Sequence, residues 1–228
     1  MARRGKVKVW LIVVLILVAL IGFVVYSFTA KARDLGVRYT EKDLQSMLKK
    51  AKMDFGKPPT SGSRSDYTYK WTGKVRANAV YTQEEITAWL NLDMPSYVPY
   101  KNVQIKLNKD GTIEASANIN FKALEYYLTP EERKYIPSFI PASAPVYGKL
   151  TGYVENNVVH LKPESVVIGV VPVPKNLLTE SNVSYVERKI ESLLSQIPNL
   201  YIETLKVQDG KIIYKGTEPA KLERIKNP

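Results

Sequence analysis

The segment from Val9 to Ala30 is the feature that most limits what this chain can be. It reads VWLIVVLILVALIGFVVYSFTA and holds no charged residue over 22 positions. A helix rises about 1.5 Å per residue, so about 20 apolar residues cross a hydrocarbon core of about 30 Å. Trp10 and Tyr26 stand near its two ends, where aromatic rings favour the headgroup region. We therefore expect a transmembrane helix over residues 9–30.

Basic residues on both sides of this segment predict its orientation. Two of them, Lys31 and Arg33, follow the segment, and the four that precede it are Arg3, Arg4, Lys6 and Lys8. Because positive charge stays on the cytoplasmic side, we expect residues 1–8 in the cytoplasm and the rest outside the cell membrane. We expect a juxtamembrane helix and linker loop over residues 31–66 and an exported domain over residues 67–228.

A cleaved signal peptide is the alternative, since Ala30-Lys31-Ala32 resembles a cleavage site between small residues. The apolar region of a signal peptide is normally about 7–15 residues long, and this one is longer, so an uncleaved signal-anchor is favoured. The chain has no cysteine, which excludes a lipid-modified cysteine anchor, disulfides and thiolate metal sites. In either case the remainder is exported, and nucleic acid is not expected as a partner.

Charge and titratable residues indicate a protein that is not an enzyme. Of the net charge of +11, the first 33 residues carry +6, so the exported part is only mildly basic. The single histidine, His160, falls on the polar, solvent-facing side of a predicted strand. Asp110 and Asp209 stand in predicted turns, where the backbone conformation favours aspartate. No group of residues has the spacing of a metal site or of a nucleophile with its base, so no catalytic residue, metal or cofactor is expected.

Helix starts are marked twice by the same pattern. Thr40 with Asp43, and Thr82 with Glu85, each place an N-cap hydroxyl before an acidic third residue. Either the two starts form an internal repeat at an offset of 42 residues or capping chemistry recurs by itself; the sequence leaves both open. A third helix is predicted by apolar spacing from Val183 to Ile197.

Alternation of apolar and polar residues predicts antiparallel strands. The stretch Tyr67–Tyr81 alternates along most of its length and reads as one half-buried strand. Turns at Asp110-Gly111, Asn156-Asn157 and Asp209-Gly210 predict three hairpins. Hairpins joined by amphipathic helices favour the α+β class, with helices packed on a twisted antiparallel sheet.

Binding is the function that these elements favour, in one of two forms. A sheet under an amphipathic helix encloses either an apolar groove for a membrane lipid or similar ligand, or a closed core. In the second form the chain is an envelope interaction or assembly domain, whose basic strand face meets an envelope protein, anionic lipid heads or a wall polymer. The residues expected to line the groove or core are Trp71, Trp89, Ile105, Ile113, Ile119, Leu193 and Leu194.

Four stretches add a resemblance that covers about half of the exported region: YTQEEITAWLN, VQIKLNKDGTIEASANI, VVPVPKNLL and LKVQDGKIIYKG. With the order of elements, they resemble membrane-anchored exported bacterial proteins of the YpmS-like kind and, more distantly, the tubular lipid-binding (TULIP) superfamily. The resemblance implies a long curved antiparallel sheet wrapped on a helix, an apolar groove for an acyl chain, and no catalytic residues. The helix expected over 39–53 and the loop over 56–66 have no counterpart in that pattern.

Overall fold

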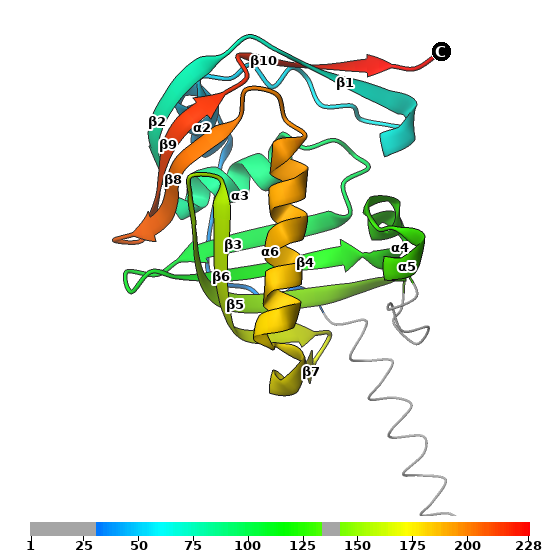
Figure 1. Ribbon diagram of the computed structural model, residues 1–228, viewed down its shortest axis with the longest axis vertical. Helices are drawn as coiled ribbons and strands as arrows, with labels where there is room; N and C mark the ends of the chain where they lie inside the picture. The colour runs from blue at the N-terminus through cyan, green and yellow to red at the C-terminus, as the bar shows by residue number, and fades with distance from the viewer. Residues whose placement is uncertain (1–30, 134–141) are drawn as a thin grey trace, which may run out of the picture.

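A computed structural model describes residues 31–133 and 142–228 of the chain (Figure 1). The expected transmembrane helix over 9–30, its aromatic residues and the basic residues before it lie outside the described residues. Within the described ranges, no helix combines the length and apolar character that crossing a bilayer requires. The described chain is α+β with antiparallel strands and few helices, which confirms the predicted class.

Two sheets hold the strands. The large sheet has eight strands, six of them in the order β2-β9-β8-β5-β4-β3. Strand β6 pairs with β5 and β7 pairs with β6, and the small sheet pairs β1 with β10. The large sheet consists of β2 (Val75–Tyr81), β3 (Tyr100–Leu107), β4 (Thr112–Asn120), β5 (Ser143–Glu155), β6 (Val158–Ile168), β7 (Val171–Pro172), β8 (Tyr201–Gln208) and β9 (Lys211–Glu218). The small sheet consists of β1 (Tyr67–Thr72) and β10 (Lys221–Lys226).

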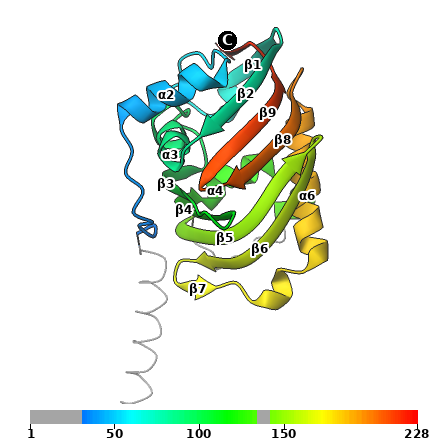
Figure 2. The same ribbon diagram turned by 90° about the vertical axis from the view of Figure 1, so that its left-hand side faces the viewer.

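Strand β5 joins two halves of the large sheet. Residues 143–151 pair with β4, residues 153–155 pair with β8, and β6 pairs with residues 146–155. A long, twisted strand that changes partner in this way bends the sheet. Figure 2 shows the strands sweeping in a curve between α3 on one side and α6 on the other.

The three long helices are α2 (Glu41–Ala51), α3 (Gln83–Leu92) and α6 (Glu180–Ser195). Capping boxes are present at Thr40 and Thr82, as the sequence predicts. The short helices are α4 (Phe121–Leu124) and α5 (Pro130–Arg133), and the 3-10 turns are η1 (Arg64–Asp66), η2 (Glu125–Tyr127) and η3 (Lys175–Leu177).

A row of side chains across five neighbouring strands forms the centre of the core. Across the neighbouring strands β2, β9, β8, β5 and β6, the residues paired in this row are Ala79, Tyr214, Leu205, Val154 and Val159. Met47 and Ala51 of α2 belong to the same buried cluster, and α3 and α6 pack against it from their own sides. Helix α2, within the segment 31–66, therefore packs on the same core as the strands that follow it.

The single strand predicted over 67–81 is wrong: the chain breaks at Gly73, and its halves join different sheets. Gly73 has φ +69°, and a Cβ there would lie 2.7 Å from the Cβ of Ala220. Alternation continues across the break, because Tyr69 and Trp71 are half-buried while Ala77 and Ala79 are buried. The periodicity therefore predicts correctly which side of these strands faces inward, but it does not indicate that β1 pairs with β10.

Helix α3 covers the outer edge of β3. Three polar side chains, one per turn of α3, hydrogen-bond the backbone of alternate β3 residues at 2.8–3.1 Å. Such bonds satisfy the exposed groups of an edge strand as a neighbouring strand would. The pairs are Gln83 with Leu107, Thr87 with Ile105, and Asn91 with Val103.

Candidate functional site: an apolar cavity beneath helix α6

Helix α6 packs along β6, whose first half has no strand partner on this side in the described residues (Figure 1). The carboxylates of Glu187 and Glu191 accept hydrogen bonds from the backbone N–H of Leu161 (2.7 Å) and Val159 (2.8 Å). No side chain of α6 is fully buried, although the helix carries the apolar stripe that its sequence predicts. Ile190 and Leu194 of α6 pack against the central core, while Val186 and Leu193 leave apolar surface exposed on the helix.

An apolar cavity of about 230 Å³ lies between the first half of α6 and strands β5 and β6. Leu177 and Val186 on its wall remain 53% and 46% exposed, so the cavity is open to its surroundings. An engineered apolar cavity of about 150 Å³ binds benzene, so this space suits a larger apolar group such as part of an acyl chain. Its lining is Leu150, Leu161, Pro163, Val166, Leu177, Leu178, Asn182, Val183 and Val186.

A wider groove of about 770 Å³ lies at the other end of α6, against β1. Here Trp71 of β1 and Leu193 of α6, both expected from the sequence, line the same groove. Leu193 is 45% exposed, and Arg64 and Lys70 add positive charge to the wall. The groove is thus amphipathic, whereas only one polar side chain lines the cavity at the first end.

The other predicted groove residues are spread over the fold. Trp89 and Leu194 pack against the central core, where the ring of Trp89 lies 5.5 Å from that of Phe55. The three isoleucines are half-buried on β3 and β4: Ile113 is paired with Leu150 of the cavity wall, Ile105 with Ala115, and Ile119 with Tyr100.

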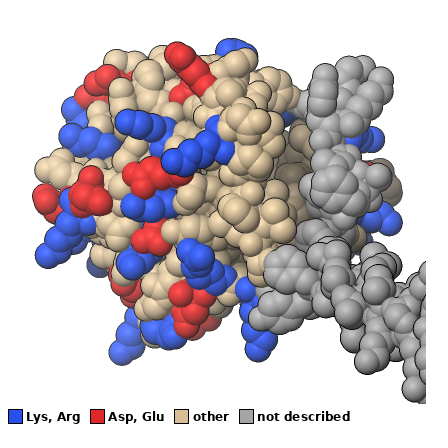
Figure 3. Space-filling view, turned by 90° about the horizontal axis from the view of Figure 1, so that it is seen from below, with Lys and Arg blue, Asp and Glu red and all other residues tan. Residues whose placement is uncertain are grey.

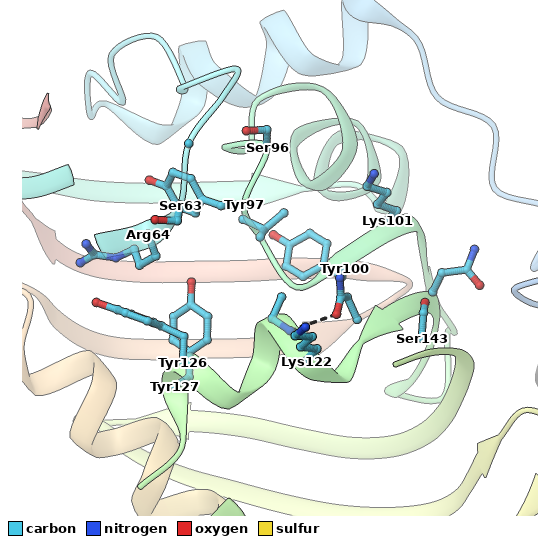
Figure 4. Close-up of a pocket in the computed structure, with 15 residues that line it drawn as sticks. Ser63, Arg64, Ser96, Tyr97, Tyr100, Lys101, Lys122, Tyr126, Tyr127 and Ser143 are labelled. Carbon is cyan, nitrogen blue, oxygen red and sulfur yellow. Dashed lines mark hydrogen bonds between the residues drawn. The ribbon is translucent and has the colours of Figure 1, made fainter. Parts of the chain in front are cut away.

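A third cavity, of about 430 Å³, is lined by tyrosines (Figure 4). Tyr97 precedes β3, Tyr100 is the first residue of β3, and Tyr126 and Tyr127 belong to η2. The four side chains gather around one space. Burial raises the pKa of Tyr100 to about 12, so its hydroxyl stays a hydrogen-bond donor at neutral pH. Three cations, Arg64, Lys101 and Lys122, line the same cavity, and no acidic residue does.

The wall of this tyrosine cavity continues into β1. The Tyr69 and Tyr97 hydroxyls are hydrogen-bonded, and the guanidinium of Arg64 lies 3.8 Å from the Tyr69 ring centroid. Arg64 also donates to the carbonyl of Tyr67 at 2.8 Å. Arg64 is therefore fixed in place, whereas Lys101 and Lys122 are exposed at the rim.

Sequence reasoning missed the tyrosine cavity because its residues come from segments far apart in the chain. The available signals were the alternating tyrosines at the start of β1 and the adjacent pair Tyr126-Tyr127, but neither indicates which segments meet. The cavity beneath α6 had a clearer signal, the apolar run VVPVPKNLL before the helix.

Titratable groups in the described ranges do not form a metal site, since no three His, Asp or Glu side chains gather there. His160 is exposed on β6 and stacks on Tyr153, with ring centroids 4.6 Å apart. Glu218 is 9% exposed, and burial raises its pKa to about 7. It lies beside the buried Tyr81 and Tyr214, away from the three cavities described above.

Searches of protein-family models, of curated proteins and of solved structures found no match to this chain.

Proposed function

We propose that the chain is a single-pass membrane-anchored exported protein that binds an acyl chain or similar apolar ligand in the cavity beneath α6, without catalysing a reaction. The observation that carries the proposal is the lining of this cavity, in which Asn182 is the single polar side chain. Pockets that bind small ligands are typically lined by apolar side chains with a small number of polar groups. A bilayer that holds the uncharged segment over residues 9–30 would supply such ligands beside the domain, which supports the proposal.

The partial burial of α6 supports this use of the cavity. Elements whose side chains stay in part exposed open locally at lower free energy than fully buried core elements, and no side chain of α6 is fully buried. The sheet is curved, with α6 against one side (Figure 2), and the resemblance to tubular lipid-binding proteins implies a curved sheet beside a groove that holds an acyl chain.

Photocrosslinking tests the proposal directly. The full chain is reconstituted in vesicles that contain a phospholipid with a diazirine at the end of one acyl chain, and crosslinked peptides are mapped by mass spectrometry. We expect labels on β5, β6 and the first half of α6. Val183→Trp fills the cavity and should remove these labels, whereas Ser192→Trp, exposed on the same helix, should keep them. An unchanged pattern in Val183→Trp would contradict the proposal.

A second candidate function rests on the tyrosine cavity. The lining holds three cations and no acidic residue, and together with its asparagine, serine and tyrosine side chains it suits a hydroxyl-rich anionic polymer such as a polyol-phosphate wall polymer. Lys101→Ala with Lys122→Ala should weaken binding of the polymer and flatten its salt dependence. Lys211→Ala with Lys226→Ala, two exposed lysines outside the cavity, is the control. Equal loss in both pairs would identify nonspecific attraction instead.

A further inference from the structure

The lower end of the molecule carries a cluster of exposed apolar residues. Its centre is the segment 170–178, which forms β7 and η3 and which we call the apolar tip. Val170, Val171 and Leu177 are 36%, 49% and 53% exposed. Lys175 is the one charged residue of the tip. Monomeric soluble domains seldom expose contiguous apolar surface without an interaction partner.

The described chain begins at this same end. The guanidinium of Arg33 lies 3.9 Å from the ring centroid of Tyr147 on β5. Tyr147 is paired with Val167 on β6, and Val167 is paired with Pro172 of the tip. Neighbouring strands are about 4.8 Å apart, so the guanidinium of Arg33 lies about two strand widths from the tip, and the chain then continues to β3, where Leu35 donates to Gln104. In Figures 1 and 2 the start of the described chain and β7 both lie toward the lower end.

The sequence before Arg33 determines what this end faces. Residues 9–30 are the uncharged apolar segment, and only residues 31 and 32 separate it from Arg33. A link this short spans at most about 10 Å, so a bilayer that holds the segment also lies against this end of the domain. Figure 3 views this end from below, where an area of uncharged surface lies between the charged side chains on the left and the residues drawn in grey.

We propose that the apolar tip inserts into the surface of the bilayer that holds residues 9–30 and opens the cavity beneath α6 to the lipid. Leu177 and Leu178 belong both to the tip and to the cavity wall, so an acyl chain can pass from the bilayer to the cavity along apolar side chains. Lys175 adds a cation beside the insertion, which favours an anionic surface. The entry route rests on the proposed lipid-binding function, whereas the insertion itself does not.

The absence of cysteine makes the insertion measurable by single-cysteine labelling. Val171→Cys and Leu177→Cys in the full chain are each labelled with an environment-sensitive fluorophore and reconstituted in vesicles with or without nitroxide-labelled lipids. An inserted side chain lies about 5–10 Å into the headgroup and acyl boundary, so strong quenching by shallow nitroxides is expected. Lys226→Cys on β10, at the opposite end of the molecule (Figure 1), is the control and should show little quenching.

A charged variant separates insertion from mere proximity. In a chain labelled at Lys175→Cys, adding Val171→Asp and Leu177→Asp should reduce quenching several-fold, while circular dichroism stays unchanged because both positions are exposed. Quenching at the tip no greater than at Lys226→Cys would overturn the proposal. A label shielded from water but not quenched by lipid would also overturn it and would indicate a second protein copy.

The crosslinking experiment above distinguishes the two proposals. Quenching at the tip without acyl crosslinks in the cavity would leave insertion standing and refute lipid binding. Crosslinks without quenching would support binding and refute insertion. A full chain that fails to float with vesicles would refute both.

Discussion

Helices α3 and α6 cover two edges of the same sheet by the same device, but with different strength. Each helix presents polar side chains four residues apart to alternate residues of an antiparallel strand, α3 to β3 and α6 to β6. The match is geometric: four helical residues advance about 6.0 Å and two strand residues about 6.7 Å. A helix can therefore replace an edge neighbour over two or three hydrogen-bonding positions.

The difference lies in what surrounds the bonds. Helix α3 buries Glu85, Thr87 and Ala88, at 4%, 0% and 0% exposure, and uses neutral side chains for its edge bonds. Helix α6 uses two glutamates and buries no side chain fully. Bonds sealed from water cost most when broken, because the separated groups find no replacement partner. The α3 edge is thus a permanent part of the core, while the α6 edge is suited to opening above a cavity.

The largest effect is expected at Asn91, whose side chain bonds both the N–H and the carbonyl of Val103. Asn91→Leu leaves both groups unpaired and should lower the free energy of unfolding by about 4 kcal/mol. Denaturant unfolding of the full chain in micelles measures this. Asn78→Leu on the exposed face of β2 is the control and should change stability little. If Asn91→Leu lowered the free energy of unfolding by less than Glu187→Ala with Glu191→Ala does, the proposed difference between the α3 and α6 edges would be contradicted.

The buried acid Glu218 affects folding stability in the opposite direction with pH from an acid held in an ion pair. Burial raises the pKa of Glu218 to about 7, so its ionisation favours the unfolded chain, and stability falls as the pH rises from about 4.5 to 7. Glu218→Gln should therefore stabilise the protein by about 3 kcal/mol at pH 8 and leave it nearly unchanged at pH 4. Melting of both proteins across this pH range provides the measurement. If the stabilities of the two proteins differed by the same amount at every pH, the prediction would be contradicted.

Helix α3 is also tied to α2 by an ion pair between Lys50 and Glu85. Lys50 donates to Glu85 at 2.7 Å, and Ser46 donates to the same carboxylate. Although burial raises the pKa of Glu85, these bonds outweigh it and hold the pKa below its usual value. The stabilisation is thus present at neutral pH and lost as the pH falls through that lowered pKa.

Glu85→Gln should destabilise the protein by about 2 kcal/mol at pH 7, because it leaves Lys50 without its charge partner. The gap between variant and wild type should narrow in acid. Glu155→Gln, at an exposed position on β5, is the control and should change stability little in the same unfolding series.

The smallest global effect is expected at the α6 edge. Glu187→Ala with Glu191→Ala should cost less than about 1 kcal/mol of global stability, since water can reach the released amides. Hydrogen exchange at Val159 and Leu161 should nevertheless accelerate clearly. Glu187→Gln with Glu191→Gln retains an acceptor oxygen and should preserve the protection. Unchanged exchange in the alanine pair would show that α6 does not protect this edge through its glutamates.

Local features of the fold could be predicted because they depend on neighbouring residues. The hairpin turns were found from Asp-Gly and Asn-Asn, and the structure gives positive φ at Asn156, Asn157, Asp209 and Gly210, as such turns require. Thr40 and Thr82 cap their helices for the same local reason. The groove residues were harder: Trp71 and Leu193 line one groove, but nothing near either residue in sequence indicates that pairing.

The sequence by itself determined the α+β class, the three hairpins, the three long helices and which side of most strands faces inward, because spacing and turn chemistry act within a few residues. It also supplies the uncharged segment over 9–30 on which the membrane proposal rests. Only the tertiary structure decided that Gly73 divides one alternating run between two sheets, that β5 changes partner, and that α3 and α6 serve as edge neighbours. These outcomes depend on contacts between distant segments, and one strand's periodicity is the same whichever partner it meets.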